Sequence, residues 1–403
     1  MWEEKRLGDI CTKIGSGATP NGGSGAYKES GFSLIRSQNV LDFSFSEDGL
    51  AFIDGVQAEK LKGVTVEKGD VLLNITGDSV ARSCIVPNRI LPARVNQHVS
   101  IIRPDQNKAS NIFVFYYTQY IKPYLLSIGS NGGTRNALTK AIIEDLKITI
   151  PPLPTQQKIA DILSAYDDLI ENNNRRIELL EQAAQQLYKE WFVRFRFPEY
   201  ETAHFTKGIP DGWEVVKLED VVEIGRGSSP RPIADQKYFE NGNIPWIKIA
   251  DATASKMYIT ETKEYVNEFG ASFSRKLKPG SLILAASGTL GFPMFLGIEG
   301  CIHDGWLYFD NFNGISPKYL YYNLISLTER FNAFSYGAAI QNINTGIVKN
   351  TKSILPPLQL QNIFDDKISI IHGQIRTLQA KNQNLIKQRD LLLPRLMSGK
   401  LDV

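Results

Sequence analysis

The sequence predicts an α/β protein of two homologous domains, joined by two long helices that form an antiparallel intrachain coiled coil. The tripeptide Pro151-Pro152-Leu153 recurs as Pro356-Pro357-Leu358, an offset of 205 residues. Each copy follows a variable segment of similar length and precedes a long heptad pattern of apolar residues. A repeat of this length is too long for one solenoid unit, so it indicates two domains, and an antiparallel helix pair would relate them by a pseudo-twofold axis.

The composition is that of an ordinary globular protein. The 403 residues suffice for two domains with a core each, and 42% of them are hydrophobic and 22% charged. No apolar run approaches the ~20 residues of a membrane span, so we expect no membrane partner. Cys11, Cys84 and Cys301 match neither a disulfide framework nor a zinc motif, which favours a cytoplasmic location. With a net charge of +2, binding to DNA would require basic groups concentrated on one face.

The two halves of the chain can be aligned along most of their length. Trp2 corresponds to Trp213 at an offset of 211, and Tyr116 corresponds to Tyr321 at an offset of 205. Residues 68–77 and 279–288 both predict a turn, a buried strand and a small polar loop. The halves therefore share a scaffold.

Other segments of the two halves have little in common, namely 40–66 against 252–276 and 78–97 against 289–302. A shared scaffold with different loops is expected of two domains that recognise different targets. Neutral drift in surface loops is the alternative.

A long helix is expected to start after each Pro-Pro-Leu copy. Its apolar residues recur with heptad spacing, which favours a coiled coil over an ordinary surface helix. In the first helix, positions a and d are Leu163, Ile170, Ile177, Ala184, Trp191 and Ile159, Tyr166, Asn173, Leu180, Leu187. In the second helix, positions a and d are Ile368, Ile375, Asn382, Arg389 and Phe364, Ile371, Leu378, Leu385, Leu392.

One asparagine in each seam predicts the orientation of the pair. In an antiparallel pair position a faces position d, so Asn173 at d can face Asn382 at a. In this alignment the a and d residues of the remaining layers also face each other, for example Leu163 with Leu392 and Trp191 with Phe364. A buried asparagine pair costs stability but fixes the register. The alternative is that each helix packs separately on its own domain.

The first helix, from Ile159 to Trp191, would be roughly 50 Å long at ~1.5 Å per residue. Domains that overlap its ends would lie closer together, near the ~34–36 Å between DNA half-sites one turn apart. We therefore expect the helix pair to act as a molecular ruler.

Several sequence signatures together resemble one family. The first helix ends in Leu-Tyr-Lys-Glu-Trp-Phe-Val at 187–193, and the chain closes with Leu-Leu-Leu-Pro-Arg-Leu-Met-Ser-Gly-Lys-Leu at 391–401. Pro-Pro-Leu-Pro-x-Gln-Gln at 151–157 and the Gly-x-Gly openings at 15–17 and 225–227 complete the set. Together they resemble the specificity (S) subunits of type I restriction–modification systems over essentially the whole chain.

The resemblance implies a non-catalytic subunit that recognises double-stranded DNA. Two target recognition domains would each read one half of a bipartite, asymmetric site, and the helices would set the spacer. The helices would also dock two methyltransferase (M) subunits, which restriction (R) subunits join. S-adenosylmethionine, ATP and Mg would be used by those partners, so no cofactor is expected in this chain. The domain boundaries are recognition domain 1 at 1–153, helix 1 at 154–195, a linker at 196–212, recognition domain 2 at 213–358, helix 2 at 359–398 and a tail at 399–403.

The sequence offers no catalytic motif, which is consistent with a binding subunit. Asn243-Ile244-Pro245-Trp246 lacks the first proline of the [D/N]PP[Y/F/W] tetrapeptide with which aminomethyltransferases hold a flipped base. Neither a dinucleotide fingerprint nor a Walker A sequence is present, and the four histidines show no metal spacing. We interpret His98 and His303 as strand-end residues. The sequence therefore predicts no catalytic residue and no metal site.

Polar residues in corresponding loops of the two domains are the candidates for DNA contact, because Arg, Lys, Asn and Gln read bases while Ser, Thr and backbone N–H groups hold phosphates. In the first domain they are Ser16, Thr19, Lys28, Arg36, Gln38, Asn39, Thr76, Ser79, Arg82, Arg135 and Asn136. In the second domain they are Arg226, Ser228, Arg231, Lys248, Ser287, Thr289, Gln341, Asn342 and Asn344. Each could equally be a solvated loop residue.

Two alternative functions remain open from the sequence. The first is a specificity subunit of a type IIB-like system, whose partner fuses methylation and cleavage. The second is a coiled-coil scaffold that binds two proteins.

Overall fold

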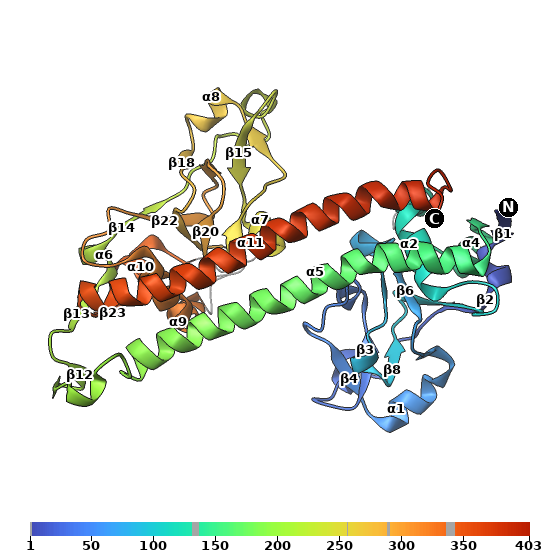
Figure 1. The fold of residues 1–403 in the computed structure, drawn as a ribbon, viewed down its shortest axis with the longest axis horizontal. Coiled ribbons are helices and arrows are strands. Elements are labelled where there is room, and N and C mark those ends of the chain that lie inside the picture. The colour runs from blue at the N-terminus through green and yellow to red at the C-terminus, as the bar shows by residue number, and fades with distance from the viewer. Residues whose placement is uncertain (1, 131–136, 256, 288–290, 336–342) are drawn as a thin grey trace. The chain divides into compact units, whose positions relative to one another are not determined.

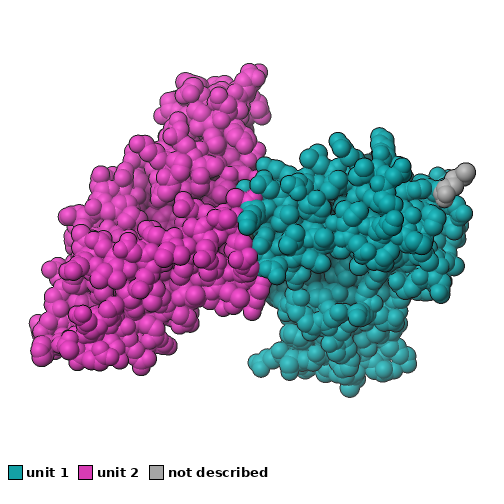
Figure 2. All heavy atoms as spheres, in the orientation of Figure 1, with its two compact units in different colours: residues 1–173, 381–403 teal, residues 174–380 magenta. Residues whose placement is uncertain are grey.

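A computed structural model of the chain describes residues 2–130, 137–255, 257–287, 291–335 and 343–403. The chain divides into two compact units (Figure 2). Unit 1 comprises residues 1–173 and 381–403, and unit 2 comprises residues 174–380. Each long helix therefore contributes one half to each unit. Among the described residues, none of the helices is both long enough and apolar enough to cross a membrane.

Unit 1 is a mixed α/β unit (Figure 1). Its strands are β1 Glu3–Arg6, β2 Cys11–Ser16, β3 Phe32–Ile35, β4 Ala51–Ile53, β5 Thr65–Val66, β6 Val71–Asn74, β7 Ser83–Ile85, β8 Ala93–Val95, β9 Val99–Pro104 and β10 Lys147–Ile150. Its short helices are α1 Gly55–Lys60, α2 Asn111–Tyr120, α3 Lys122–Ser130 and α4 Lys140–Asp145.

Unit 2 is built from a corresponding set of elements (Figure 1). Its strands are β11 Phe205–Thr206, β12 Ile209–Pro210, β13 Glu214–Lys217, β14 Glu223–Arg226, β15 Ile244–Ile247, β16 Tyr258–Ile259, β17 Tyr265–Val266, β18 Arg275–Leu277, β19 Leu282–Ala285, β20 Pro293–Leu296, β21 Gly300–Ile302, β22 Trp306–Asp310 and β23 Lys352–Leu355. Its shorter helices are α6 Leu218–Val221, α7 Ile249–Ala254, α8 Glu268–Ala271, α9 Pro317–Ser335 and α10 Thr345–Lys349.

The two units share their sheet topology. One sheet has the order β2-β9-β6-β7 in unit 1 and β14-β22-β19-β20 in unit 2, where β16 adds a further strand. The other has the order β4-β3-β8-β5 in unit 1 and β17-β15-β21-β18 in unit 2. Its central pair is parallel in both cases, β3 with β8 and β15 with β21, while the flanking pairs are antiparallel. The prediction of two homologous α/β domains is confirmed.

The core of each unit lies where its sheets meet its helices. In unit 1 the apolar side of β6 and β9 packs with α2 and with residues of both long helices, including Leu163 and Leu396. In unit 2 the corresponding cluster joins β19 and β22 to α9 and to long-helix residues such as Ala184 and Phe364. A second cluster in each unit fills the space between its two main sheets.

The long helices are α5 Leu153–Tyr188, which continues into a π-helical turn at Lys189–Val193, and α11 Leu358–Met397. All predicted a and d positions are buried or half-buried. Within unit 1, Asn173 donates a hydrogen bond to Asn382 over 2.8 Å. Within unit 2, the rings of Trp191 and Phe364 lie 6.0 Å apart. In each unit the two helix segments therefore run antiparallel, in the predicted register.

The Pro-Pro-Leu motif of each unit ends a strand and begins a long helix. A glutamine one turn into the helix is fully buried, and it joins the first proline of the motif to the backbone of a segment that precedes another helix of the unit. In unit 2, Gln361 accepts a hydrogen bond from the N–H of Ser316 and donates to the carbonyls of Gly314 and Pro356. In unit 1, Gln156 accepts from the N–H of Ser110 and donates to the carbonyl of Pro151. We call this set of hydrogen bonds of Gln156 or Gln361 the clasp. It explains why the glutamine recurs together with the prolines.

The segment 196–212, predicted as a linker, contains the short hairpin of β11 and β12. Gly208 in its turn has a φ of +83°, a conformation that favours glycine. The segment thus has regular structure of its own.

Candidate nucleic-acid interface

In unit 1, polar loops that follow four strands meet in one place. The hydroxyl of Thr19, beyond β2, donates to Gln97 over 2.5 Å. Gln97 lies 3.1 Å from the ring nitrogen Nε2 of His98, and the other ring nitrogen lies 2.7 Å from the hydroxyl of Thr76, which follows β6. The N–H of Asn96, after β8, binds the last carbonyl of β3 over 2.9 Å. The predicted residues Thr19 and Thr76 are therefore brought together.

The second glycine of each Gly-x-Gly opening is required by packing. A Cβ atom on Gly17 would lie 1.7 Å from the carbonyl oxygen of Val95, and one on Gly227 would lie 2.3 Å from that of His303. Only glycine allows the loop after β2 or β14 to cross so closely over the end of β8 or β21. This crossing positions Ser16 and Thr19 in unit 1, and Arg226 and Ser228 in unit 2.

A tight turn after β3 holds Arg36 and Gln38. The N–H of Arg36 donates to Asn39 over 3.0 Å, and the amide group of Asn39 donates to Ser46 over 3.0 Å. Asn39 is fully buried, so in this structure it fixes the turn and its side chain does not reach solvent. The guanidinium group of Arg36 lies over the ring of Tyr27 and binds the carbonyl of Gly49.

Unit 2 repeats this construction after β15. The N–H of Lys248 donates to the carboxylate of Asp251 over 2.8 Å, as that of Arg36 does to Asn39. The ammonium group of Lys248 lies 2.6 Å from Glu264 and 5.3 Å from the ring centroid of Trp246. Both units therefore present a cation at the start of a capped turn, although the neighbouring side chains differ.

Two arginines of unit 2 gather around Asp304, which follows β21. Arg226 donates from Nε to the carbonyl of Asp304 over 2.6 Å, and Arg231 pairs with its carboxylate. The side chain of Arg231 is 68% exposed, so this ion pair contributes little stability and can give way to a phosphate. Burial lowers the pKa of the adjacent His303, so its ring is neutral at pH 7. The cluster is net cationic.

The predicted candidates differ in accessibility. The exposed ones are Ser16, Thr19, Lys28, Gln38, Arg226, Ser228, Arg231 and Asn344. The half-buried ones are Arg36, Thr76, Ser79, Arg82, Lys248 and Ser287. The candidates outside the described residues are Arg135, Asn136, Thr289, Gln341 and Asn342.

Asn344 accepts a hydrogen bond from the N–H of Gly346 and so caps α10. Within the described part of the chain, the side chains of Lys28, Ser79 and Arg82 form no hydrogen bond or ion pair.

Sequence reasoning missed Gln97, Asp304 and Glu264. His98 and His303, interpreted as strand-end residues, do lie at strand ends, but they also belong to the polar clusters. The signal was available, because the residues after β8 and β21 occupy corresponding places in the two halves. Their role as neighbours of Thr19 or Arg231 depends on contacts between segments about 75 residues apart.

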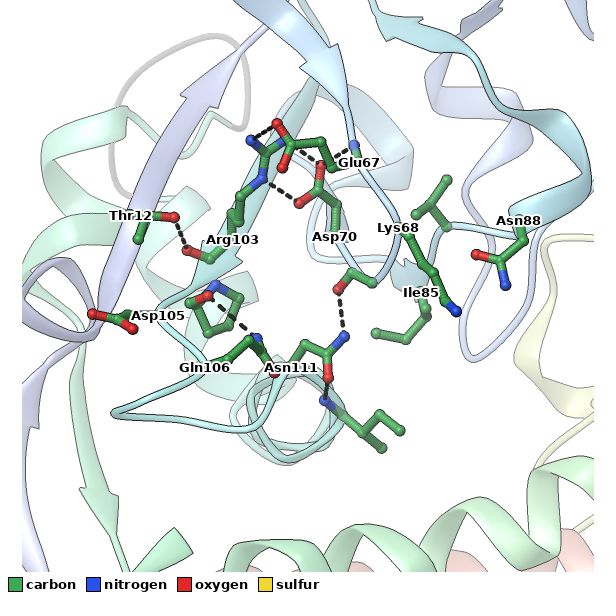
Figure 3. A pocket seen from close by; sticks show the side chains of 14 residues that line it. Thr12, Glu67, Lys68, Asp70, Ile85, Asn88, Arg103, Asp105, Gln106 and Asn111 are labelled. Atoms are coloured by element: carbon green, nitrogen blue, oxygen red, sulfur yellow. Dashed lines mark hydrogen bonds and ion pairs between the residues drawn. The ribbon is translucent and has the colours of Figure 1, made fainter.

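A separate hollow of about 590 Å³ lies in unit 1 beneath the turn at Lys68 (Figure 3). In it Arg103 forms two bonds of 2.7 and 2.8 Å with Asp70, whose side chain is 1% exposed, and also pairs with Glu67. The hydrogen bonds that Arg103 donates to the carboxylate of Asp70 raise the pKa of Arg103. These charges satisfy one another and join β9 to the turn before β6, so they stabilise the fold.

The two units share one architecture, and each has its own polar and cationic loops. This arrangement is that of a protein that recognises a target with two parts. The chain belongs to the type I restriction modification DNA specificity domain family, whose model matches residues 1–182 and 210–388. The chain is 26% identical to the type I restriction enzyme HindI specificity subunit of Haemophilus influenzae, with 99% of each chain covered. It is 27% identical to the MjaIX specificity subunit of Methanocaldococcus jannaschii, covering all of this chain and 94% of that one.

A solved structure supports the fold independently. The S subunit of a type I restriction–modification system from M. genitalium matches 98% of this chain and 96% of its own length, with a TM-score of 0.57 at 13% identity. The relatives favour the type I interpretation over a type IIB-like subunit or a protein scaffold.

Proposed function

We propose that this chain is the non-catalytic DNA-recognition subunit of a type I restriction–modification enzyme, and that each unit reads one half of a bipartite, asymmetric site. The observation that carries the proposal is the duplicated match to a DNA specificity domain, once for each unit. The paired cationic turns at Arg36 and Lys248 support it, because they offer side chains for base or phosphate contact at equivalent places.

The long helices are the proposed docking platform for two methyltransferase subunits, through which restriction subunits join. Exposed apolar side chains recur along both helices, and docked subunits would remove them from water. They are Ile162, Leu169 and Leu179 on α5, and Ile363, Ile370, Ile386 and Leu391 on α11. S-adenosylmethionine, ATP and Mg would be bound by those partners. Three free thiols support a cytoplasmic location for the complex.

Selection from random DNA tests the proposal. The chain, in complex with its methyltransferase subunit, is incubated with random-sequence duplexes at fixed salt, and the retained duplexes are sequenced. We expect two short motifs separated by an unspecified spacer of constant length. Retained duplexes without sequence enrichment would indicate a protein scaffold. One contiguous motif would contradict the division of reading between two units.

A change in helix length tests the ruler. The Asn173–Asn382 bond fixes the register of α5 against α11, so one heptad added to each helix on the same side of this layer preserves the pairing. Such a variant is expected to select the same two motifs with a longer spacer, in the same sequencing assay. A heptad added to one helix only is the control, because it breaks the register. Retention of the original spacer by the double insertion would refute the ruler.

A further inference from the structure

Arg389 occupies a heptad position that normally holds an apolar side chain, and it is only 5% exposed. A buried charge is costly unless it is paired and hydrogen-bonded. The DNA-binding role proposed above does not explain why this position of α11 is cationic.

The charge of Arg389 is balanced within unit 1. Its NH1 atom donates to Asp167 of α5 over 2.6 Å, and its NH2 atom donates to the neighbouring Asp390 over 2.8 Å. The second oxygen of Asp167 accepts a hydrogen bond from the hydroxyl of Tyr116, on α2, over 2.5 Å. The network therefore ties both long helices to the body of unit 1.

The same guanidinium group also contacts a loop. Its central carbon lies 3.5 Å from the ring centroid of Phe43, a close cation–π contact. Phe43 has a φ of 62° and lies edge-on to Phe115, with ring centroids 6.0 Å apart. It belongs to the segment 40–46, which directly follows the turn of Arg36 and Gln38. Asp42 of this segment pairs with Lys122 over 2.5 Å.

Unit 2 has a different group at the corresponding place. The counterpart of Asp167, 205 residues later, is His372 of α11, which is 3% exposed. Its Nδ1 atom lies 3.0 Å from the hydroxyl of Tyr258, and its Nε2 atom lies 2.9 Å from that of Tyr322. Tyr258 begins β16, just after the segment that follows the turn of Lys248. In unit 2, too, a buried side chain of a long helix contacts the variable part of the unit, but through an uncharged hydrogen bond.

We propose that Arg389 and His372 are positioning residues for half-site recognition. Arg389 anchors the segment 40–46 of unit 1 to a long helix through Phe43, and His372 anchors the start of β16 in unit 2 through Tyr258. Each contact thereby holds the cationic turn that precedes it in the chain. The anchoring contact is a cation–π contact with Phe43 in unit 1 and an uncharged hydrogen bond with Tyr258 in unit 2. This inference rests on the proposed DNA-recognition function, and it names the residues that align each reading loop.

The test uses the full chain with its methyltransferase subunit and the selection from random duplexes. Arg389→Met keeps the side-chain volume but removes the cation–π contact and the ion pair. We expect base preference in one half-site to fall by about tenfold, the order of one mismatched base pair, with the other half-site unchanged. Lys387→Met is the control, because Lys387 is an exposed cation on the same helix.

Tyr258→Phe is the reciprocal variant, since it removes only the hydroxyl that binds His372. It is expected to relax the other half-site and to leave the half-site affected by Arg389→Met unchanged. Phe43→Leu removes the aromatic ring of the cation–π contact with Arg389. If Arg389→Met does not fold, the half-site preferences of Phe43→Leu test the inference for unit 1. Unchanged preferences, or equal losses in both half-sites, would overturn the inference. Absence of enrichment by the unaltered protein would instead overturn the proposed function.

Discussion

Replacement of Gln361 by leucine is expected to lower the free energy of unfolding of unit 2 by about 3–5 kcal/mol, because three buried backbone groups would lose their partner. The side chain is fully buried; it accepts from Ser316 over 2.8 Å and donates to Gly314 and Pro356 over 2.9 and 2.8 Å. Leucine fills a similar volume but bonds to none of them. Denaturant unfolding followed by tryptophan fluorescence measures the loss.

The fluorescence reports mainly on unit 2, which holds Trp191, Trp213, Trp246 and Trp306, whereas unit 1 holds Trp2. Gln359→Leu is the matched control, because the same substitution falls on an exposed position of the same helix. Equal stabilities of the Gln361 and Gln359 variants would show that the clasp at the Pro-Pro-Leu junction contributes no stability.

The long helices could be predicted because their pattern is local and repetitive. The asparagines at positions 173 and 382 gave the antiparallel register, since only one alignment places both polar groups in one layer. α5 begins one residue before the predicted 154, and α11 begins and ends one residue before the predicted 359 and 398. The larger difference is at the end of α5, where the α-helix ends at Tyr188 and a π-helical turn continues to Val193, against the predicted 195. Side-chain periodicity determines helix type better than it determines helix ends.

The residues of the candidate interface were harder to predict from the sequence than the helices were. Asn39 has the amide side chain expected of a residue that reads bases, yet this amide accepts a hydrogen bond from the N–H of Arg36 and caps the turn. Asn344 likewise caps α10. Asparagine serves both purposes, and the sequence around it does not reveal which backbone N–H groups lie within reach.

Arg389 illustrates a further limit. Its heptad position predicts burial, but its partners Asp167 and Phe43 are separated from it by hundreds of residues. Phe43 lies in a segment that has little in common with its counterpart in the other half, so the repeat offered no guide to its position. Contacts between the shared scaffold and a variable segment therefore cannot be predicted from the repeat or from the heptad pattern.

The neutral anchor in unit 2 predicts a pH dependence of stability. Burial, together with the positive charges of Lys318 and Arg376, lowers the pKa of His372 from an ordinary value of 6.5 to about 3. The unfolded chain therefore binds a proton on this residue between pH 6.5 and 3 that the folded chain does not bind. The stability contribution is complete above pH 6.5 and declines as the pH falls. Between pH 7 and pH 5 the loss is about 2 kcal/mol.

The prediction is checked by comparing unfolding free energies at pH 7 and pH 5 for the protein and for His372→Asn. The variant is less stable at both pH values, since the hydroxyls of Tyr258 and Tyr322 lose their partner, but its stability should fall less steeply with acidification. Burial raises the pKa of Asp365, which acts in the opposite direction and is present in both proteins, so the difference between them isolates the histidine. His204→Asn, at an exposed histidine, is the control. Identical pH slopes for the protein and His372→Asn would mean that His372 is protonated as readily in the folded state as in the unfolded one, and a neutral anchor at this position would then be untenable.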